Sequence, residues 1–157
     1  MQLMESHDTM KDGFMAELAE AATAVFEPSA IFLAYAYGSR ISGRPRPESD
    51  LDVGYYLSGF PAAEVLTIRE EMVLALRLSD RLGTEVDLRN LADATLELRG
   101  RVLEEGVRIY CRDNVARVNL ERDLLGRYHD YKESFRRMHE ISLRQFARCA
   151  TFFSGAT

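Results

Sequence analysis

The sequence predicts an α/β (α+β) fold, in which helices flank a small mixed β-sheet. Short apolar segments of strand length alternate with longer segments whose apolar residues recur every three or four positions. The chain has 157 residues, of which 46% are hydrophobic, which is enough to bury one sizeable core. We therefore expect a single domain overall, with a core over residues 1–112 and a helical extension over residues 113–157 packing on it.

The first third of the chain predicts one helix and two strands. Residues 9–26 place apolar side chains at helical spacing, and Pro28 ends the run. The apolar and aromatic segment at residues 30–37 runs into Gly38, which is typical of a buried strand. After a loop rich in Pro, Arg and Gly, residues 50–57 alternate well enough to form a second strand.

The remainder predicts three helices and two strands. A helix opens at Pro61 and closes at Gly83, and its apolar face is predicted to contain Val65, Ile68, Met72, Leu76 and Leu82. A strand over residues 84–91, a helix over 92–106 and a short edge strand over 107–111 follow. From Asp113 onward the pattern is helical, with a break expected near Gly126.

Composition narrows the class of protein. No apolar run approaches the roughly 20 residues of a membrane helix, and we expect neither a membrane span nor a signal peptide. The net charge of −5 argues against a general nucleic-acid binder. Cys111 and Cys149 lie far apart and outside any Cys-x-x-Cys motif, so we expect no disulfide framework and a cytoplasmic location.

Two carboxylates mark the start of the second predicted strand. Asp50 and Asp52 are two residues apart, so both project from the same face of a strand. Carboxylates this close repel one another unless a cation or a proton separates them, and hard oxygen ligands suit Mg²⁺. A third carboxylate on the next predicted strand would complete the site. Asp87 is the best-placed candidate, and Glu85 is its rival.

A Gly-Ser turn precedes the carboxylates. Gly38 lets the backbone turn tightly against a ligand, and Ser39 adds a hydroxyl donor. Arg40 is the nearest of three arginines to the turn, and the loop that follows can bring the turn beside Asp50 and Asp52. A Gly-Ser turn alone is usually only a turn, and an Asp-x-Asp pair alone is usually a solvated strand end. Together they predict a site for a nucleoside triphosphate, with its phosphates between the turn and Mg²⁺.

The spacing of these motifs resembles a known signature. Tyr37-Gly38-Ser39, ten further residues and Asp50-Leu51-Asp52-Val53 resemble the DNA polymerase β-like nucleotidyltransferase superfamily. The short chain and its later segments resemble the minimal nucleotidyltransferases (MNT) that act as antitoxins in HEPN/MNT toxin–antitoxin systems. The resemblance implies transfer of AMP from ATP to a tyrosine of a HEPN ribonuclease toxin. It implies that Gly38 and Ser39 bind the triphosphate and that Asp50, Asp52 and Asp87 hold Mg²⁺.

Other functions stay open at this stage. A non-catalytic antitoxin or nucleotide-binding module could inhibit the toxin by occlusion, and a small-molecule nucleotidyltransferase of the aminoglycoside-modifying kind is a third hypothesis. Arg122, His129 and Tyr131 superficially resemble the motif of the HEPN toxins themselves, but the strand–helix alternation disfavours a helical-bundle ribonuclease. We expect a hetero-oligomer with a toxin, and a homodimer is a further possibility, because the later part of the helical extension combines arginines with aromatic residues.

Overall fold

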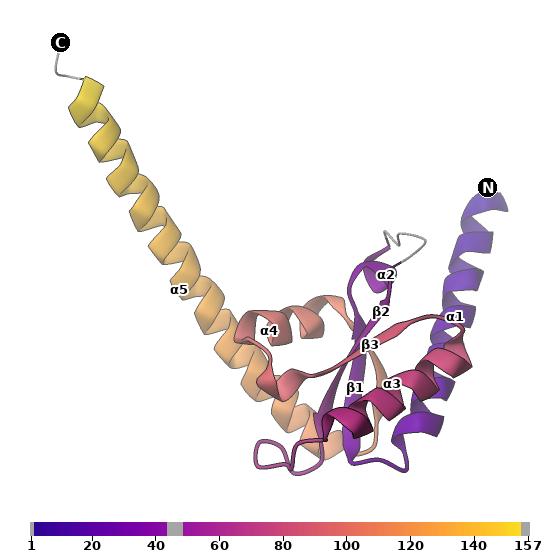
Figure 1. Cartoon of the computed structure of the whole chain (residues 1–157). Coiled ribbons are helices and arrows are strands. Elements are labelled where there is room, and N and C mark those ends of the chain that lie inside the picture. The colour runs from indigo at the N-terminus through magenta and orange to yellow at the C-terminus, as the bar shows by residue number, and fades with distance from the viewer. Residues whose placement is uncertain (1, 44–48, 155–157) are drawn as a thin grey trace.

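The computed structural model describes the backbone of residues 2–43 and 49–154, and the side chains of residues 12–43 and 49–145. Helices and strands alternate along the chain (Figure 1). They are α1 (Gln2–Phe26), β1 (Ile31–Tyr37), α2 (Ser39–Ser42), β2 (Leu51–Leu57), α3 (Ile68–Leu82), β3 (Val86–Asn90), the 3₁₀ turn η1 (Leu91–Asp93), α4 (Leu96–Glu105), β4 (Val107–Cys111) and α5 (Asn114–Ser154). The α/β fold class predicted from the sequence is confirmed.

The four strands form one mixed sheet in the order β3-β2-β1-β4. Strand β1 is antiparallel to both β2 and β4, whereas β2 and β3 are parallel and are joined through α3. A parallel pair needs such a crossover connection, since a tight hairpin can join only antiparallel strands. Strand β4 lies at one edge of the sheet, as predicted.

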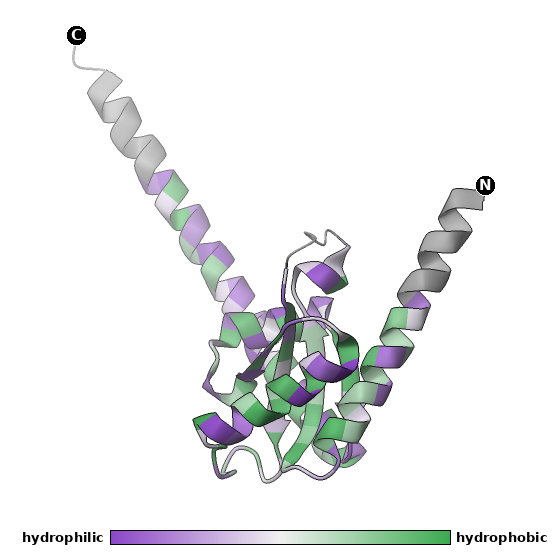
Figure 2. Cartoon of the chain, turned by 45° about the vertical axis from the view of Figure 1, so that its right-hand side comes forward, coloured by the Kyte–Doolittle hydropathy of each residue, from purple (hydrophilic) through white to green (hydrophobic). Residues whose placement is uncertain are grey.

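Helices cover both faces of the sheet, and a core lies on each side (Figure 2). On one face, α1 and α3 pack against side chains such as Leu51, Val53 and Ala36. On the other face, α4 and α5 pack against side chains such as Tyr35 and Tyr56. Alternate residues of β2 therefore point to opposite helical layers, which places Asp52 on the side of α4 and α5.

The predicted start and buried face of α3 are wrong. The helix begins at Ile68 and not at Pro61, because Thr67 caps it: the Thr67 hydroxyl accepts from the Glu70 N–H, and the Glu70 carboxylate accepts from the Thr67 N–H. Leu74 and Leu78 are the buried residues of the helix. Four of the residues placed on the apolar face of the predicted helix are exposed, namely Val65, Ile68, Met72 and Leu76.

The C-terminal helix is continuous, so the break predicted near Gly126 is wrong. Among the described residues, nothing lies within 4 Å of a Cβ built at Gly126, and the helix runs through it without interruption. Leu120, Leu124 and Tyr128 are buried against the sheet and α4, and beyond them α5 extends away from the body (Figure 1). No helix in the described part of the chain is long and apolar enough to cross a membrane.

Candidate functional site

Two of the predicted carboxylates lie side by side on the sheet. In the parallel register of β2 and β3, Asp52 is opposite Asp87. The pKa of Asp52 is raised, first by burial and then by the negative charge of Asp87, while Arg89 lowers it and Asp50 raises it further. Arg89 lies 3.9 Å from the Asp87 carboxylate, in an exposed pair that screens the charge weakly. Like charges held this close create a site that attracts a cation.

The other two acidic candidates lie just outside the strands. Asp50 is exposed and immediately precedes β2, while Glu85 is exposed and immediately precedes β3, where its carbonyl accepts from the Leu51 N–H at 2.8 Å. Within the described part of the chain, no three His, Cys, Asp or Glu side chains are grouped closely enough to hold a metal ion. The structure thus brings Asp52 and Asp87 together without closing the predicted three-carboxylate cluster, as mutual repulsion of bare carboxylates favours.

The Gly-Ser turn packs directly against Asp52. Gly38 follows β1 with a φ of 82°, a conformation that L side chains rarely adopt, and a Cβ at this position would overlap the Asp52 carboxylate. The Gly38 carbonyl accepts from the N–H groups of Ile41 and Ser42, which forms the short helix α2. Only glycine allows the turn to lie this close to the carboxylate.

Arg40 carries an unsatisfied donor. Its side chain is half-buried, and its Nε atom is buried without a hydrogen-bond partner among the residues that the structure describes. A buried polar atom of this kind normally has a partner. An anion bound at the turn would supply one. Arg44 and Arg46 lie in the segment 44–48, outside the described residues.

A cavity of about 370 Å³ opens beside the turn. Its lining comes from the end of β1, from α2 and from one side of α4: Tyr37, Gly38, Ser39, Ser42, Leu98, Arg101, Val102 and Glu105. The α4 residues were not predicted as site residues, because their helical spacing carries no motif. A larger cavity of about 490 Å³ lies between the loop after β2 and the start of α5, and none of the predicted site residues lines it.

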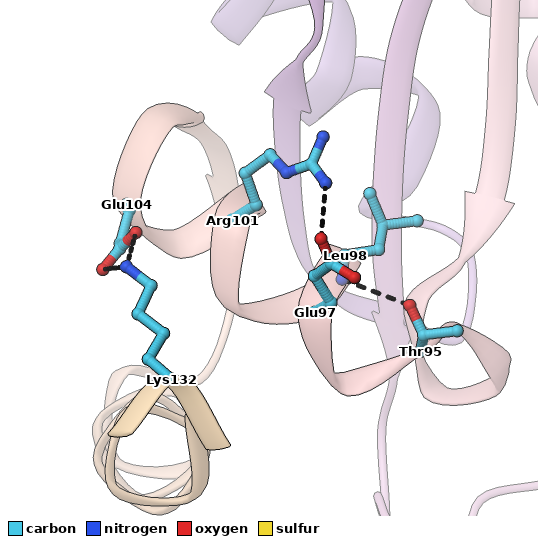
Figure 3. A network of polar contacts seen from close by, with 6 residues as sticks. All are labelled: Thr95, Glu97, Leu98, Arg101, Glu104 and Lys132. Atoms are coloured by element: carbon cyan, nitrogen blue, oxygen red, sulfur yellow. Dashed lines mark hydrogen bonds and ion pairs between the residues drawn. The ribbon is translucent and has the colours of Figure 1, made fainter. Parts of the chain in front are cut away.

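Contacts with α5 fix the position of α4 (Figure 3). Lys132 donates to both carboxylate oxygens of Glu104, at 2.8 and 2.7 Å, and its ammonium lies 4.5 Å from the centre of the Tyr128 ring. A Cβ at Gly100 would overlap the Tyr128 ring, so the two helices are in close contact there. Thr95 caps α4 by accepting from the Leu98 N–H at 3.2 Å.

A comparison with protein families decides the class of the protein. The family described as polymerase β nucleotidyltransferase matches residues 20–115, a range that includes the Gly-Ser turn and all the candidate carboxylates. The chain belongs to the polymerase β nucleotidyltransferase family. The resemblance to the polymerase β-like nucleotidyltransferase superfamily is thereby confirmed.

Solved structures share this nucleotidyltransferase's fold. A chain of a toxin–antitoxin complex with AMP-PNP has a TM-score of 0.61 and 17% identity, covering 80% of this chain and 98% of the other. A chain of the MntA–HepT toxin–antitoxin has a TM-score of 0.58 and 16% identity, with 80% and 97% covered. A chain of the complex between tri-AMPylated Shewanella oneidensis HEPN toxin and MNT antitoxin has a TM-score of 0.59 and 15% identity, with 82% and 98% covered. No curated protein sequence matches the chain.

Proposed function

We propose that this nucleotidyltransferase is the antitoxin of a HEPN ribonuclease toxin and neutralises it by transferring AMP from ATP to a tyrosine. The observation that carries the catalytic part is the contact between Gly38 and Asp52, with Asp87 opposite Asp52 in the sheet. This contact supports the proposal, because a turn that bound phosphate would lie beside paired carboxylates. The structural neighbours that contain a HEPN toxin and an AMP-PNP complex support the partner and the donor nucleotide.

The residues present fit a divalent cation. The raised pKa of Asp52 reflects burial and the charge of Asp87, and a cation between these groups would relieve both costs. Asp50, Asp52 and Asp87 would hold Mg²⁺, with Asp87 preferred over Glu85 because it lies opposite Asp52. When bound, Mg²⁺ supplies positive charge that stabilises the transferring phosphoryl group.

The protein's own residues hold and orient the reactants. Gly38 and Ser39 bind the triphosphate, and the unsatisfied Nε of Arg40 donates to it. The tyrosine oxygen attacks the α-phosphorus, a new P–O bond forms, and the bond to pyrophosphate breaks. Asp87, which is exposed, accepts the tyrosine proton. Positioning and electrostatic stabilisation supply most of the rate in such transfers.

The projecting part of α5 is proposed as the docking surface for the toxin, in a hetero-oligomer formed in the cytoplasm. Residues 1–112 would then be the catalytic core and residues 113–157 the extension. Tyr131, Phe135 and Met138 follow one another at helical spacing and are exposed, Phe135 to 60% and Met138 to 66%. Apolar residues in such a row on a monomer mark an interaction site, and a HEPN toxin is the partner that the structural neighbours suggest.

Occlusion without catalysis is the second candidate. It is favoured by one observation: the exposed apolar residues of α5 could bind a toxin whether or not AMP is transferred. The test compares inhibition of the toxin's ribonuclease activity by the wild type and by Asp50→Ala/Asp52→Ala, each with ATP and Mg²⁺. If the proposal is correct, the toxin treated with the wild type stays inactive after the two proteins are separated, whereas the toxin treated with the variant is active. Occlusion would be established if the wild type and the variant inhibit the ribonuclease equally and the toxin regains its activity once either protein is removed.

A further inference from the structure

We infer that Arg101 on α4 binds the phosphate tail of the nucleotide held at Gly38 and Ser39, and that Glu97 is its partner when no nucleotide is bound. The inference rests on the proposed function and adds a binding residue to the same site. It starts from the cavity of about 370 Å³, which is lined both by Arg101 and by the Gly-Ser turn.

The lining of the cavity favours an anion near Arg101. Arg101 is the one basic residue among the described residues that line it. A guanidinium group presents paired donors that match phosphate oxygens, so arginine suits this role better than a point charge would. Glu105 lines the same cavity one helical turn further on and would repel a phosphate. The anionic groups therefore lie on the side of the cavity nearer Arg101.

The pair between Arg101 and Glu97 is easily exchanged. The Arg101 Nη2 atom lies 3.2 Å from the Glu97 Oε1 atom, and the two side chains are 52% and 56% exposed (Figure 3). Exposed ion pairs at this spacing on a helix contribute little, because water solvates both charges. A bound polyphosphate offers more negative charge than one carboxylate, so it displaces Glu97 at small cost.

The helix that carries Arg101 is held in place on both sides of that residue. Gly100 packs against the Tyr128 ring, and Glu104 is bound by Lys132. At the end of α4, a Cβ on Gly106 would come within 3.0 Å of the Ala36 carbonyl, so the helix end lies against β1 close to the turn. These contacts fix the distance between α4 and Gly38, and Arg101 needs only a side-chain rotation to reach a ligand.

The test measures binding by calorimetry, without acceptor protein, of three probes: an ATP analogue that is not cleaved at the α-phosphorus, inorganic pyrophosphate and adenosine. Arg101→Gln is compared with Arg127→Gln, a matched control on α5. Arg127 forms the same kind of exposed pair, with Asp123 at 3.1 Å, and does not line the cavity. Circular dichroism and Tm measurements establish that each variant is folded.

We expect Arg101→Gln to bind the ATP analogue and pyrophosphate about tenfold more weakly than the wild type, which is the effect of losing a charge-assisted contact. Adenosine binding stays unchanged, Arg101→Lys recovers part of the affinity, and Glu97→Gln binds the analogue more tightly than the wild type. The inference is wrong, while the proposed function stands, if Arg101→Gln binds all three probes as tightly as Arg127→Gln does. The same holds if the affinity of Arg101→Gln for adenosine falls as much as its affinity for the ATP analogue. If the wild type binds no analogue with Mg²⁺, both the inference and the proposed catalysis fail.

Discussion

Asp52 lies opposite Asp87 in the parallel register of β2 and β3, and the carboxylate of Asp52 is in contact with the backbone of Gly38. The sheet therefore holds the half-buried charge of Asp52 close to the exposed charge of Asp87, which opposes folding unless something offsets the repulsion. In the proposed function, the cation that offsets the repulsion also participates in the reaction.

The first prediction concerns the cost of ionised Asp52. Burial and Asp87 raise the pKa of Asp52 in the folded protein, so ionisation of Asp52 destabilises the fold at neutral pH. This penalty disappears as the pH falls through the raised pKa of the folded state to the pKa of the unfolded state. Asp52→Asn should therefore raise the Tm at pH 7, by about 1–2 °C since solvent screens this partly exposed group, and have no such effect near pH 3.5. Thermal unfolding of the wild type and Asp52→Asn over this pH range measures the difference in Tm.

The same substitution should abolish AMP transfer. We expect a loss of about 100-fold or more, the scale that follows removal of a group stabilising charge in the transition state. A variant that is more stable and inactive would identify Asp52 as a functional residue kept at a cost in stability. A lower Tm at pH 7 together with full activity would contradict this account.

The second prediction concerns the Gly-Ser turn. Gly38→Ala adds backbone strain and an overlap with Asp52, so it should destabilise the fold by about 2–4 kcal/mol and eliminate ATP binding. Gly43→Ala is the matched control, because Gly43 also has a positive φ, of 91°, but has no described residue within 4 Å of its Cβ position. Gly43→Ala should lower the free energy of unfolding only by the backbone strain, about 1–2 kcal/mol, and ATP should still bind. Equal ATP affinity in the two variants would show that contact with Asp52 is unimportant.

The third prediction tests how α4 is held. Gly100→Ala would place a methyl group into the Tyr128 ring, so urea unfolding should show a loss of about 1–3 kcal/mol. Gly126→Ala lies on the exposed side of α5, with no described residue within 4 Å of its Cβ position, and should instead stabilise the protein by about 0.5–1 kcal/mol. Stabilisation by both substitutions would mean that α4 and α5 do not pack as the structure shows.

The fourth prediction separates the two exposed apolar helix faces. Met138→Asp on α5 should weaken the complex with the toxin about tenfold or more, as loss of a central contact does, with little change in Tm. Met72→Asp on α3, at a similar exposure of 59%, should leave the affinity unchanged. Surface plasmon resonance with both variants measures this, and a loss of affinity confined to Met72→Asp would move the docking surface to α3.

Much of the sheet could be predicted from the sequence, as could the closeness of the Gly-Ser turn to Asp52. Strands β1 and β2 could be recognised as dense apolar segments, because helices cover both faces of the sheet there. The spacing from Gly38 to Asp52 gave the motif that predicted the candidate site. The start of α3 was missed because Pro61 and Thr67 are both plausible helix starts, and the reciprocal bonds between Thr67 and Glu70 decide between them.

Other features could not be read from local patterns. Helices α3 and α5 carry more apolar residues at helical spacing than the sheet can cover, so periodicity alone did not reveal which side is buried. The continuity of α5 through Gly126 overrides the low helix propensity of glycine. The contribution of α4 to the cavity depends on its packing against α5 through Gly100 and Tyr128, which are far apart in the sequence. Such a contact becomes visible only in the folded chain.

The most direct test of the central claim is the intact mass of a candidate HEPN toxin after incubation with this chain, ATP and Mg²⁺. We predict that the toxin gains one or more AMP groups on tyrosine with the wild type and none with Asp50→Ala/Asp52→Ala. An unchanged toxin mass, measured with a folded wild-type chain that still blocks the ribonuclease, would contradict the account.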